Sequence, residues 1–120
     1  MPRILLADDA EEFRGVIREA LEEEGYEVVV AEDGQHALEL FRTAGPFDLL
    51  LFDHDMPRVS GRDAIASLRG SGVRAPGLIL TGSALLTQEQ LHGLDVTLLR
   101  KPVPIDVLVA EIRRALGTPP

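Results

Sequence analysis

Short apolar runs alternate with amphipathic segments along the whole chain, and this alternation restricts the fold more than any other feature of the sequence. Apolar and β-branched runs predict strands at residues 3–7, 26–31, 48–52, 76–81 and 96–100. The segments that follow these runs place apolar residues at helical spacing, which predicts helices at residues 11–24, 33–44, 61–70, 87–94 and 105–116. The helix at 87–94 is short. A strand followed by a helix is therefore expected five times.

Strands that alternate with helices form a parallel sheet, because a parallel pair needs a long crossover connection that is usually helical. The strand runs are continuously apolar, as expected of strands that are covered by helices on both faces. We therefore predict an α/β fold, a (βα)5 flavodoxin-like doubly wound parallel sheet with strand order 2-1-3-4-5. In this architecture the functional crevice lies beyond the carboxyl ends of the first and third strands.

The length and charge of the chain indicate how many domains it forms and exclude several classes of function. The chain has 120 residues, 12 Lys and Arg against 20 Asp and Glu, a formal net charge of −8, and no cysteine. We expect one domain at residues 1–117, with 118–120 as a tail or linker stub. The acidic balance argues against binding to nucleic acid or to anionic membranes, and the lack of cysteine excludes thiol catalysis. No apolar run approaches the roughly 20 residues of a membrane helix, and the N-terminus does not look like a signal peptide, so a cytoplasmic location is expected.

Polar residues follow each strand that borders the predicted crevice. They are Asp8 and Asp9 after the first strand, Asp53 and Asp55 after the third, Thr81 at the end of the fourth and Lys101 after the fifth. Lys101 is the only lysine among 12 basic residues, in a chain that otherwise uses arginine. Because the carboxyl ends of parallel strands lie at one edge of the sheet, we expect these side chains to converge.

A cluster of carboxylates beside a hydroxyl and an ammonium suits phosphoryl transfer. Neighbouring carboxylates repel one another, and a hard divalent cation such as Mg²⁺ relieves that repulsion through oxygen ligands. A carboxylate beside such a cation can act as a nucleophile toward phosphorus and form an acyl phosphate. The oxygens of the transferred group must be neutralised. Asp53, Lys101 and Thr81 suit the roles of nucleophile, cation and hydrogen-bond donor.

Each of these residues also has a plainer interpretation. Asp9 followed by Glu12 fits a capping box, which alone explains an acid before a helix. Asp53 alone is compatible with an ordinary loop acid, Thr81 with a β-branched strand residue, and Lys101 with surface charge. Taken together, these interpretations require the separate residues to reach one end of the sheet by accident.

The segment DLLLFDHDMPRVSG, residues 48–61, has the order apolar strand, Asp, two residues, Met-Pro, two residues, a small residue and Gly. It is accompanied by the acidic pair at residues 8–9, by LILTG at residues 78–82 and by the Lys-Pro pair at residues 101–102. This ordered set resembles the receiver domains of two-component response regulators over essentially the whole chain. A lone D-x-x-M-P would be a weak signal.

The resemblance implies a role for each residue. Asp53 would be phosphorylated by a phosphohistidine of a sensor histidine kinase or phosphotransfer protein. The domain would catalyse only its own phosphorylation and slow dephosphorylation, and would not be an enzyme in the usual sense. Thr81 would donate a hydrogen bond to the phosphoryl group, Lys101 would pair with it, and Gly82 would leave room for it. A cis bond would precede Pro102.

The resemblance also implies a Mg²⁺ site. Asp9 would bind the ion directly, Asp8 mainly through water, and Asp53 and the backbone carbonyl of Asp55 would complete the protein ligands. We expect a monomer or a weak homodimer.

Two other functions stay open at this stage. Residues 53–55 form a D-x-D motif, as in haloacid-dehalogenase-like phosphatases, although their motif ends the first strand and here it follows the third. The other is an interaction module with a receiver fold that phosphorylation does not regulate. The family often carries Tyr or Phe three residues before the lysine, and this chain has Leu98 there.

Overall fold

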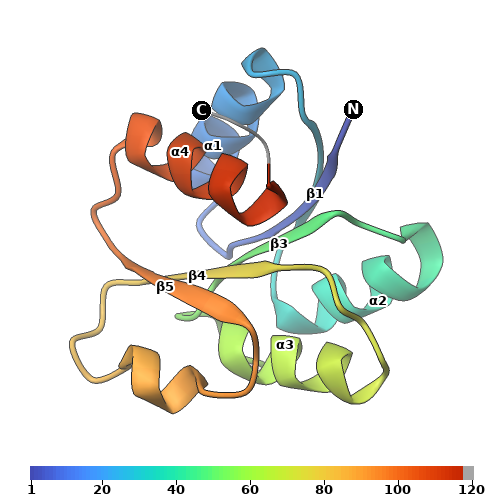
Figure 1. Cartoon of the computed structure of the whole chain (residues 1–120), viewed down its shortest axis with the longest axis vertical. Coiled ribbons are helices and arrows are strands. Elements are labelled where there is room, and N and C mark those ends of the chain that lie inside the picture. The colour runs from blue at the N-terminus through green and yellow to red at the C-terminus, as the bar shows by residue number, and fades with distance from the viewer. Residues whose placement is uncertain (118–120) are drawn as a thin grey trace.

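The computed structural model describes residues 1–117, so the tail or linker predicted at 118–120 lies outside the described residues. The strands are β1 (Arg3–Ala7), β2 (Glu27–Ala31), β3 (Leu49–Asp53), β4 (Gly77–Thr81) and β5 (Val96–Arg100). The α-helices are α1 (Glu11–Glu23), α2 (Gly34–Ala44), α3 (Gly61–Gly70) and α4 (Ile105–Leu116), and a 3-10 turn, η1, spans Gln88–Leu91. The strands pair in parallel in the order β2-β1-β3-β4-β5, which confirms the predicted topology (Figure 1).

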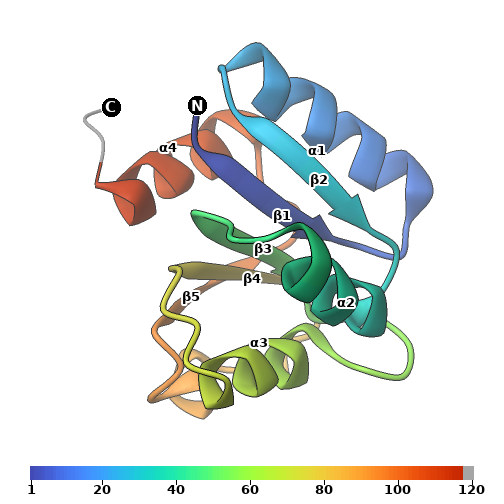
Figure 2. The same ribbon diagram turned by 90° about the vertical axis from the view of Figure 1, so that its right-hand side faces the viewer.

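The sheet is the middle layer of the molecule, with α1 and α4 on one face and α2 and α3 on the other (Figure 2). Alternate residues of β1 show how the strand serves both faces. Ile4 and Leu6 pack in the cluster with α1 and α4, whereas Leu5 and Ala7 belong to the cluster with α2 and α3. All four side chains are almost completely buried. Continuous apolar strands therefore reflect a sheet with two covered faces.

The segment predicted as a helix at 87–94 is a single turn of 3-10 helix. Thr87 and Gln90 form a capping box that fixes its start. The backbone has already left helical geometry at His92, and Gly93 adopts a positive φ of 85°. The four residues of η1 between the Thr87 cap and His92 are too few for an α-helix. The first turn of an α-helix is unfavourable, and several further residues are needed to offset its cost. The fifth strand is thus reached through a short turn.

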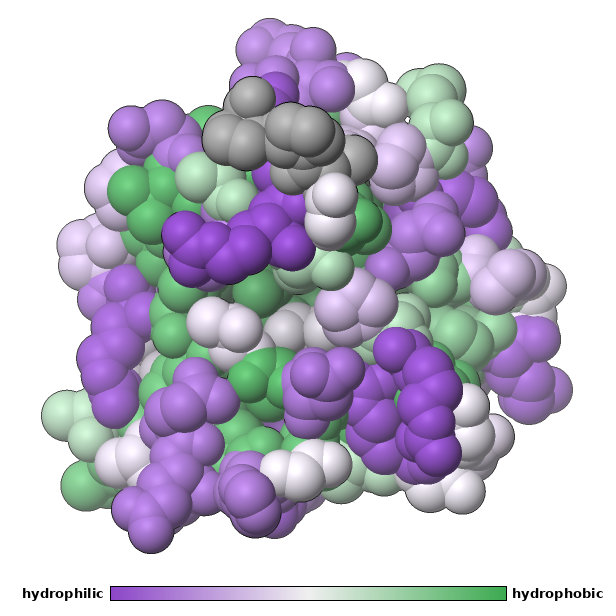
Figure 3. All heavy atoms as spheres, viewed as in Figure 1, coloured by the Kyte–Doolittle hydropathy of each residue, from purple (hydrophilic) through white to green (hydrophobic). Residues whose placement is uncertain are grey.

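Hydrophilic side chains gather in several groups on the face shown in Figure 3, with hydrophobic surface between them. The large hydrophobic side chains that are exposed are Met1, Val16, Leu85, Ile105 and Val107. Leu85 lies in the loop between β4 and η1 and is 85% exposed. Within residues 1–117, no helix is both long enough and apolar enough to cross a membrane.

Candidate functional site

Three carboxylates meet at the carboxyl ends of the neighbouring strands β1 and β3. Asp8 and Asp9 follow β1, and Asp53 is the last residue of β3. One oxygen from each lies within 4.8 Å of the others. Asp8 and Asp53 are buried, at 0% and 3% exposure, while Asp9 is exposed. The strand order places these acids together as the sequence predicts, with Asp9 as the member open to solvent.

Asp8 is a buried carboxylate with one oxygen that lacks a hydrogen-bond partner within residues 1–117, which is energetically unfavourable. Its Oδ1 accepts a hydrogen bond of 2.8 Å from the N–H of Ala10, but its buried Oδ2 has no hydrogen-bond partner within residues 1–117. Burial raises the pKa of Asp8 above its ordinary value; the Ala10 N–H lowers it in part, and the neighbouring Asp53 carboxylate raises it further. An unpartnered buried carboxylate oxygen beside two other carboxylates is the donor set that a hard divalent cation satisfies. The residues present therefore fit Mg²⁺.

The capping-box interpretation of Asp9 and Glu12 is wrong. Helix α1 begins at Glu11 with Ala10 at its cap, and no side chain caps it. The chain uses the Asp8 side chain to bind the Ala10 N–H instead, two residues along. The Asp9 side chain therefore does not cap the helix and belongs to the carboxylate cluster.

The Asp53 carboxylate is contacted from two sides. The N–H of Asp55 donates to its Oδ1 at 3.1 Å, and the ammonium of Lys101 lies 3.1 Å from its Oδ2. The peptide bond between Lys101 and Pro102 is cis, as the resemblance implies. The N–H of Lys101 donates to the carbonyl of Thr81, which ties the end of β5 to the end of β4. The only lysine of the chain therefore reaches the buried acid at the end of β3.

Gly61 lets the loop after β3 fold back against Asp53. A Cβ atom at Gly61 would lie 2.5 Å from the carbonyl oxygen of Asp53, which is closer than real Cβ contacts. Ser60 caps the helix that begins there by accepting from the N–H of Asp63 at 3.1 Å. The glycine of the motif thus serves a close backbone approach beside the site.

Thr81 is fully buried, and its hydroxyl is already engaged. It contacts the two carboxylate oxygens of Asp55 at 3.0 and 3.1 Å, and the N–H of Gly82 donates to the same carboxylate at 3.0 Å. The resemblance implies that the backbone carbonyl of Asp55 binds the metal, and the contact between the Asp55 side chain and Thr81 is not among the predictions. The D-x-D spacing is the only signal in the sequence that draws attention to this side chain.

An arginine that no motif in the sequence marks as functional holds the loop after β4. The guanidinium of Arg100, the last residue of β5, donates to the carbonyls of Ser83 and Leu86. This residue therefore fixes the loop that carries Gly82 to the strand that precedes Lys101.

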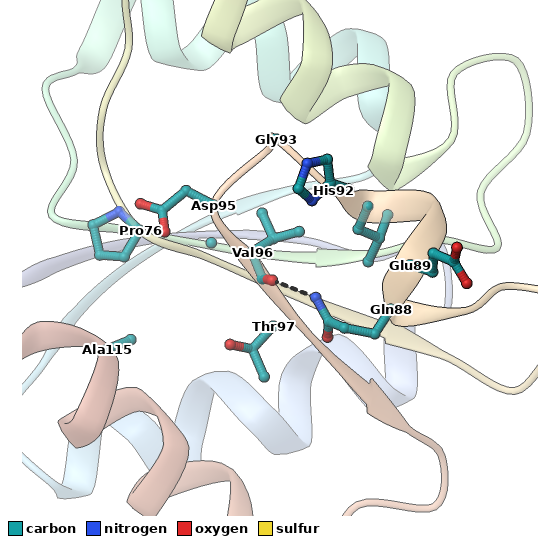
Figure 4. A pocket seen from close by; sticks show the side chains of 11 residues that line it. Pro76, Gln88, Glu89, His92, Gly93, Asp95, Val96, Thr97 and Ala115 are labelled. Atoms are coloured by element: carbon teal, nitrogen blue, oxygen red, sulfur yellow. Dashed lines mark hydrogen bonds between the residues drawn. The ribbon is translucent and has the colours of Figure 1, made fainter.

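A hollow of about 560 Å³ lies at the opposite end of the sheet, near the starts of β4 and β5 (Figure 4). Gln88 of η1 reaches the free edge of β5 there. Its Nε2 donates to the carbonyl of Val96 at 2.9 Å, and its Oε1 accepts from the N–H of Leu98 at 2.8 Å. No residue of the carboxylate cluster lines this hollow. The hollow is therefore separate from the site at the carboxyl ends of the strands.

The comparisons with known proteins agree with this geometry. The response regulator receiver domain family matches residues 4–113. The transcriptional regulatory protein CpxR of Escherichia coli is 40% identical over 121 residues, which cover 97% of this chain and 50% of CpxR. The response regulator MprA of Mycobacterium tuberculosis is 37% identical over 117 residues, or 95% of this chain and 50% of MprA. This chain spans about half the length of the curated relatives it matches.

Among solved structures, the response regulator protein TrrA of Thermotoga maritima in complex with Mg²⁺–BeF has a TM-score of 0.87 and 30% identity, covering 96% of this chain and 99% of that chain. Receiver domains bind Mg²⁺ at an acidic site, and those of response regulators are phosphorylated by histidine kinases. The family match extends over most of the chain, and the fold and the acidic cluster accord with it. The chain therefore belongs to the response regulator receiver domain family, and it is a signalling domain of two-component systems.

Proposed function

We propose that Asp53 is the phosphoacceptor and that its donor is a phosphohistidine of a sensor histidine kinase or of a phosphotransfer protein. One carboxylate oxygen of Asp53 forms the new O–P bond while the N–P bond of the donor breaks, and the product is an acyl phosphate. The observation that carries the proposal is a carboxylate that is 3% exposed, lies beside the only lysine and adjoins two other carboxylates. An ordinary acidic residue in a loop is exposed to solvent and is not expected to lie among two other carboxylates and a lysine.

Asp8, Asp9 and Asp53, together with the backbone carbonyl of Asp55, are proposed to hold Mg²⁺. The unpartnered oxygen of Asp8 supports this assignment, because cation binding would satisfy a buried group that otherwise destabilises the fold. When bound, the ion supplies positive charge next to both the nucleophilic carboxylate and the phosphoryl oxygens. The protein side chains set the position of the nucleophile.

Lys101 and Thr81 are proposed to receive the phosphoryl group. The Lys101 ammonium already contacts Asp53, and it pairs with the new group as charge accumulates there. Phosphorylation adds a charge of about −1.5 to −2, which attracts this ammonium and the Thr81 hydroxyl. Thr81 is the last residue of β4 and Lys101 directly follows β5, so movement of these residues carries the adjoining loops with them.

The domain, residues 1–117, is proposed to catalyse its own phosphorylation and slow dephosphorylation. We propose that it acts in the cytoplasm as a monomer or weak homodimer and that it binds neither nucleic acid nor membranes. The formal net charge of −8 supports the last two points, since those partners require a basic face.

Leu98 favours a switch that works without an aromatic ring. Its side chain is half-buried and packs against the core on the α2 and α3 face. A leucine at this position cannot swing a ring inward behind Thr81. The contact between Lys101 and Asp53 nevertheless favours a domain regulated by phosphorylation. It argues against an interaction module that phosphorylation does not regulate.

Intact-mass spectrometry tests the proposal directly. The protein is incubated with acetyl phosphate, with and without Mg²⁺, alongside Asp53→Asn. We expect a gain of about 80 Da, one phosphoryl group, only when Mg²⁺ and Asp53 are both present. A folded wild-type protein that gains no mass, or an Asp53→Asn variant that gains the same mass, contradicts the proposal.

A further inference from the structure

The hydrogen-bond donors at the end of β4 are occupied by Asp55 in the unphosphorylated protein. Thr81 Oγ1 lies 3.0 and 3.1 Å from the two carboxylate oxygens of Asp55, and the Gly82 N–H donates to one of them at 3.0 Å. The N–H of Ser83 donates to Thr81 Oγ1 at 3.0 Å. Asp55 therefore collects two donors from adjacent residues on its single carboxylate.

These donors cannot serve two acceptors at once. A threonine hydroxyl carries one hydrogen, and the oxygen of Thr81 already accepts from Ser83, so that hydrogen is directed at Asp55. The amide of Gly82 also has a single hydrogen. A phosphoryl group on Asp53 gains the Thr81 hydroxyl only if Asp55 releases it.

Asp55 is also connected to the phosphoacceptor through its own backbone. Its N–H donates to Asp53 Oδ1 at 3.1 Å, so one residue links the end of β3 to the end of β4. Asp55 is exposed. Its carboxylate can therefore turn toward solvent when it releases Thr81.

We propose that the Asp55 carboxylate is an internal substitute for the phosphoryl group, holding Thr81 and Gly82 until phosphorylation of Asp53 displaces it. This inference rests on the proposed function of Asp53. The phosphoryl group carries about −1.5 to −2 charge and repels the Asp55 carboxylate, while it offers stronger acceptors to the same donors. Asp55 is thus a positioning residue that opposes the active arrangement and sets how readily the domain switches.

Beryllofluoride with Mg²⁺, a stand-in for the phosphoryl group, measures this competition without a kinase. We compare its affinity by titration calorimetry for wild type, Asp55→Ala and Asp55→Asn, with Glu39→Ala as a control that removes an exposed charge from α2. Asp55→Ala should bind about tenfold more tightly, because charge-assisted hydrogen bonds no longer have to be broken. Asp55→Asn should lie between wild type and Asp55→Ala, because its amide oxygen still accepts weakly, and Glu39→Ala should match wild type.

Two results separate the proposal from simple charge repulsion. Repulsion alone gives equal affinities for Asp55→Ala and Asp55→Asn, and that equality overturns the inference. In a Thr81→Val background, the gain from Asp55→Ala should shrink, since the main donor is absent. An equal gain in both backgrounds also overturns it.

The amide resonance of Gly82 tests the resting contact by itself. A hydrogen bond to a carboxylate moves an amide proton downfield, so Asp55→Ala should shift the Gly82 signal upfield in protein without beryllofluoride. No shift of that signal overturns the resting contact. Failure of the wild type to bind beryllofluoride with Mg²⁺ contradicts the proposed function instead. Binding by wild type without tighter binding by Asp55→Ala contradicts only the displacement.

Discussion

The ammonium of Lys101 lies between an acid and an aromatic ring, 3.1 Å from Asp53 Oδ2 and 4.9 Å from the centroid of Phe13. Phe13 belongs to α1 near the start of the chain, and Lys101 follows β5 near its end. The Lys101 side chain is 27% exposed, whereas Asp53 is 3% exposed. The ring and the acid together orient the cation toward the buried carboxylate.

Replacing Lys101 with Met keeps an unbranched side chain near Phe13 but removes the positive charge. We expect the affinity for beryllofluoride in the presence of Mg²⁺ to fall by about tenfold or more, because a charge-assisted contact is lost at a poorly solvated site. Titration calorimetry measures the change. Arg42→Met on the exposed part of α2 is the matched control and should leave the affinity unaltered. Equal affinities for Lys101→Met and wild type contradict the role of the lysine.

Asp8→Asn should stabilise the metal-free protein at neutral pH. The pKa of Asp8 is raised above 3.8, mainly by burial, so the folded state is penalised above that pKa and the penalty disappears once Asp8 is protonated. We expect the free energy of unfolding to rise by about 1 kcal/mol near pH 7, and the gain to vanish as the pH falls below the ordinary pKa. Urea unfolding at both pH values measures this effect.

The same substitution should reverse its effect when Mg²⁺ is present. The ion stabilises a folded state that binds it, so wild type should gain stability with Mg²⁺ concentration while Asp8→Asn gains less. Equal Mg²⁺ dependence in the two proteins contradicts the place of Asp8 in the metal site.

Asp33 should stabilise the start of α2 in a pH-dependent way. Its carboxylate accepts from the N–H of His36 at 2.8 Å and pairs with Arg58 at 2.7 Å, and these contacts, the first above all, lower its pKa below 3.8. A lowered pKa means that the stabilisation is complete above the ordinary value and is lost as the pH falls through the lowered one. Asp33→Ala should therefore lower the free energy of unfolding by about 1 kcal/mol near pH 7, and by less in acid.

Asp33→Asn separates the two contacts in the same urea experiment. An asparagine still caps the helix but carries no charge, so we expect its loss to be smaller than that of Asp33→Ala. A loss for Asp33→Ala that stays constant between about pH 7 and about pH 3.5 argues against the ionised cap.

Two glycines of the chain should respond to alanine in opposite directions. Gly61→Ala places a Cβ 2.5 Å from the Asp53 carbonyl and should destabilise the protein by about 2 kcal/mol, with a loss of phosphorylation by acetyl phosphate. Gly15 lies in the middle of α1 with no heavy atom within 4 Å of a Cβ, so Gly15→Ala should stabilise it by up to about 1 kcal/mol. Thermal unfolding of both variants measures the contrast, and equal changes refute the close approach at Gly61.

The parts of the site that follow from strand ends were predictable from the sequence. Asp8, Asp53, Thr81 and Lys101 each stand next to a strongly apolar run, and parallel strands bring such positions to one edge. Their burial and the contact between Asp53 and Lys101 are consequences of that topology.

The contacts made by loops were not predictable in the same way. The direction of the Asp55 side chain depends on where the loop after β4 lies, and Arg100 fixes that loop from another strand. The capping box predicted from Asp9 and Glu12 does not form because α1 begins at Glu11 with Ala10, not Asp9, at its cap. Local patterns predict elements, whereas these hydrogen bonds depend on how separate loops meet.

The most direct measurement is the position of the phosphoryl group in protein phosphorylated by acetyl phosphate with Mg²⁺. Borohydride reduces an aspartyl phosphate to homoserine, and tryptic digestion then releases the peptide of residues 43–58, which contains Asp48, Asp53 and Asp55. Fragment-ion spectra decide among the three. The proposed mechanism predicts homoserine at position 53 alone and none in protein treated without Mg²⁺. Homoserine at 48 or 55, or intact aspartate at 53 in protein that has gained a phosphoryl group, contradicts it.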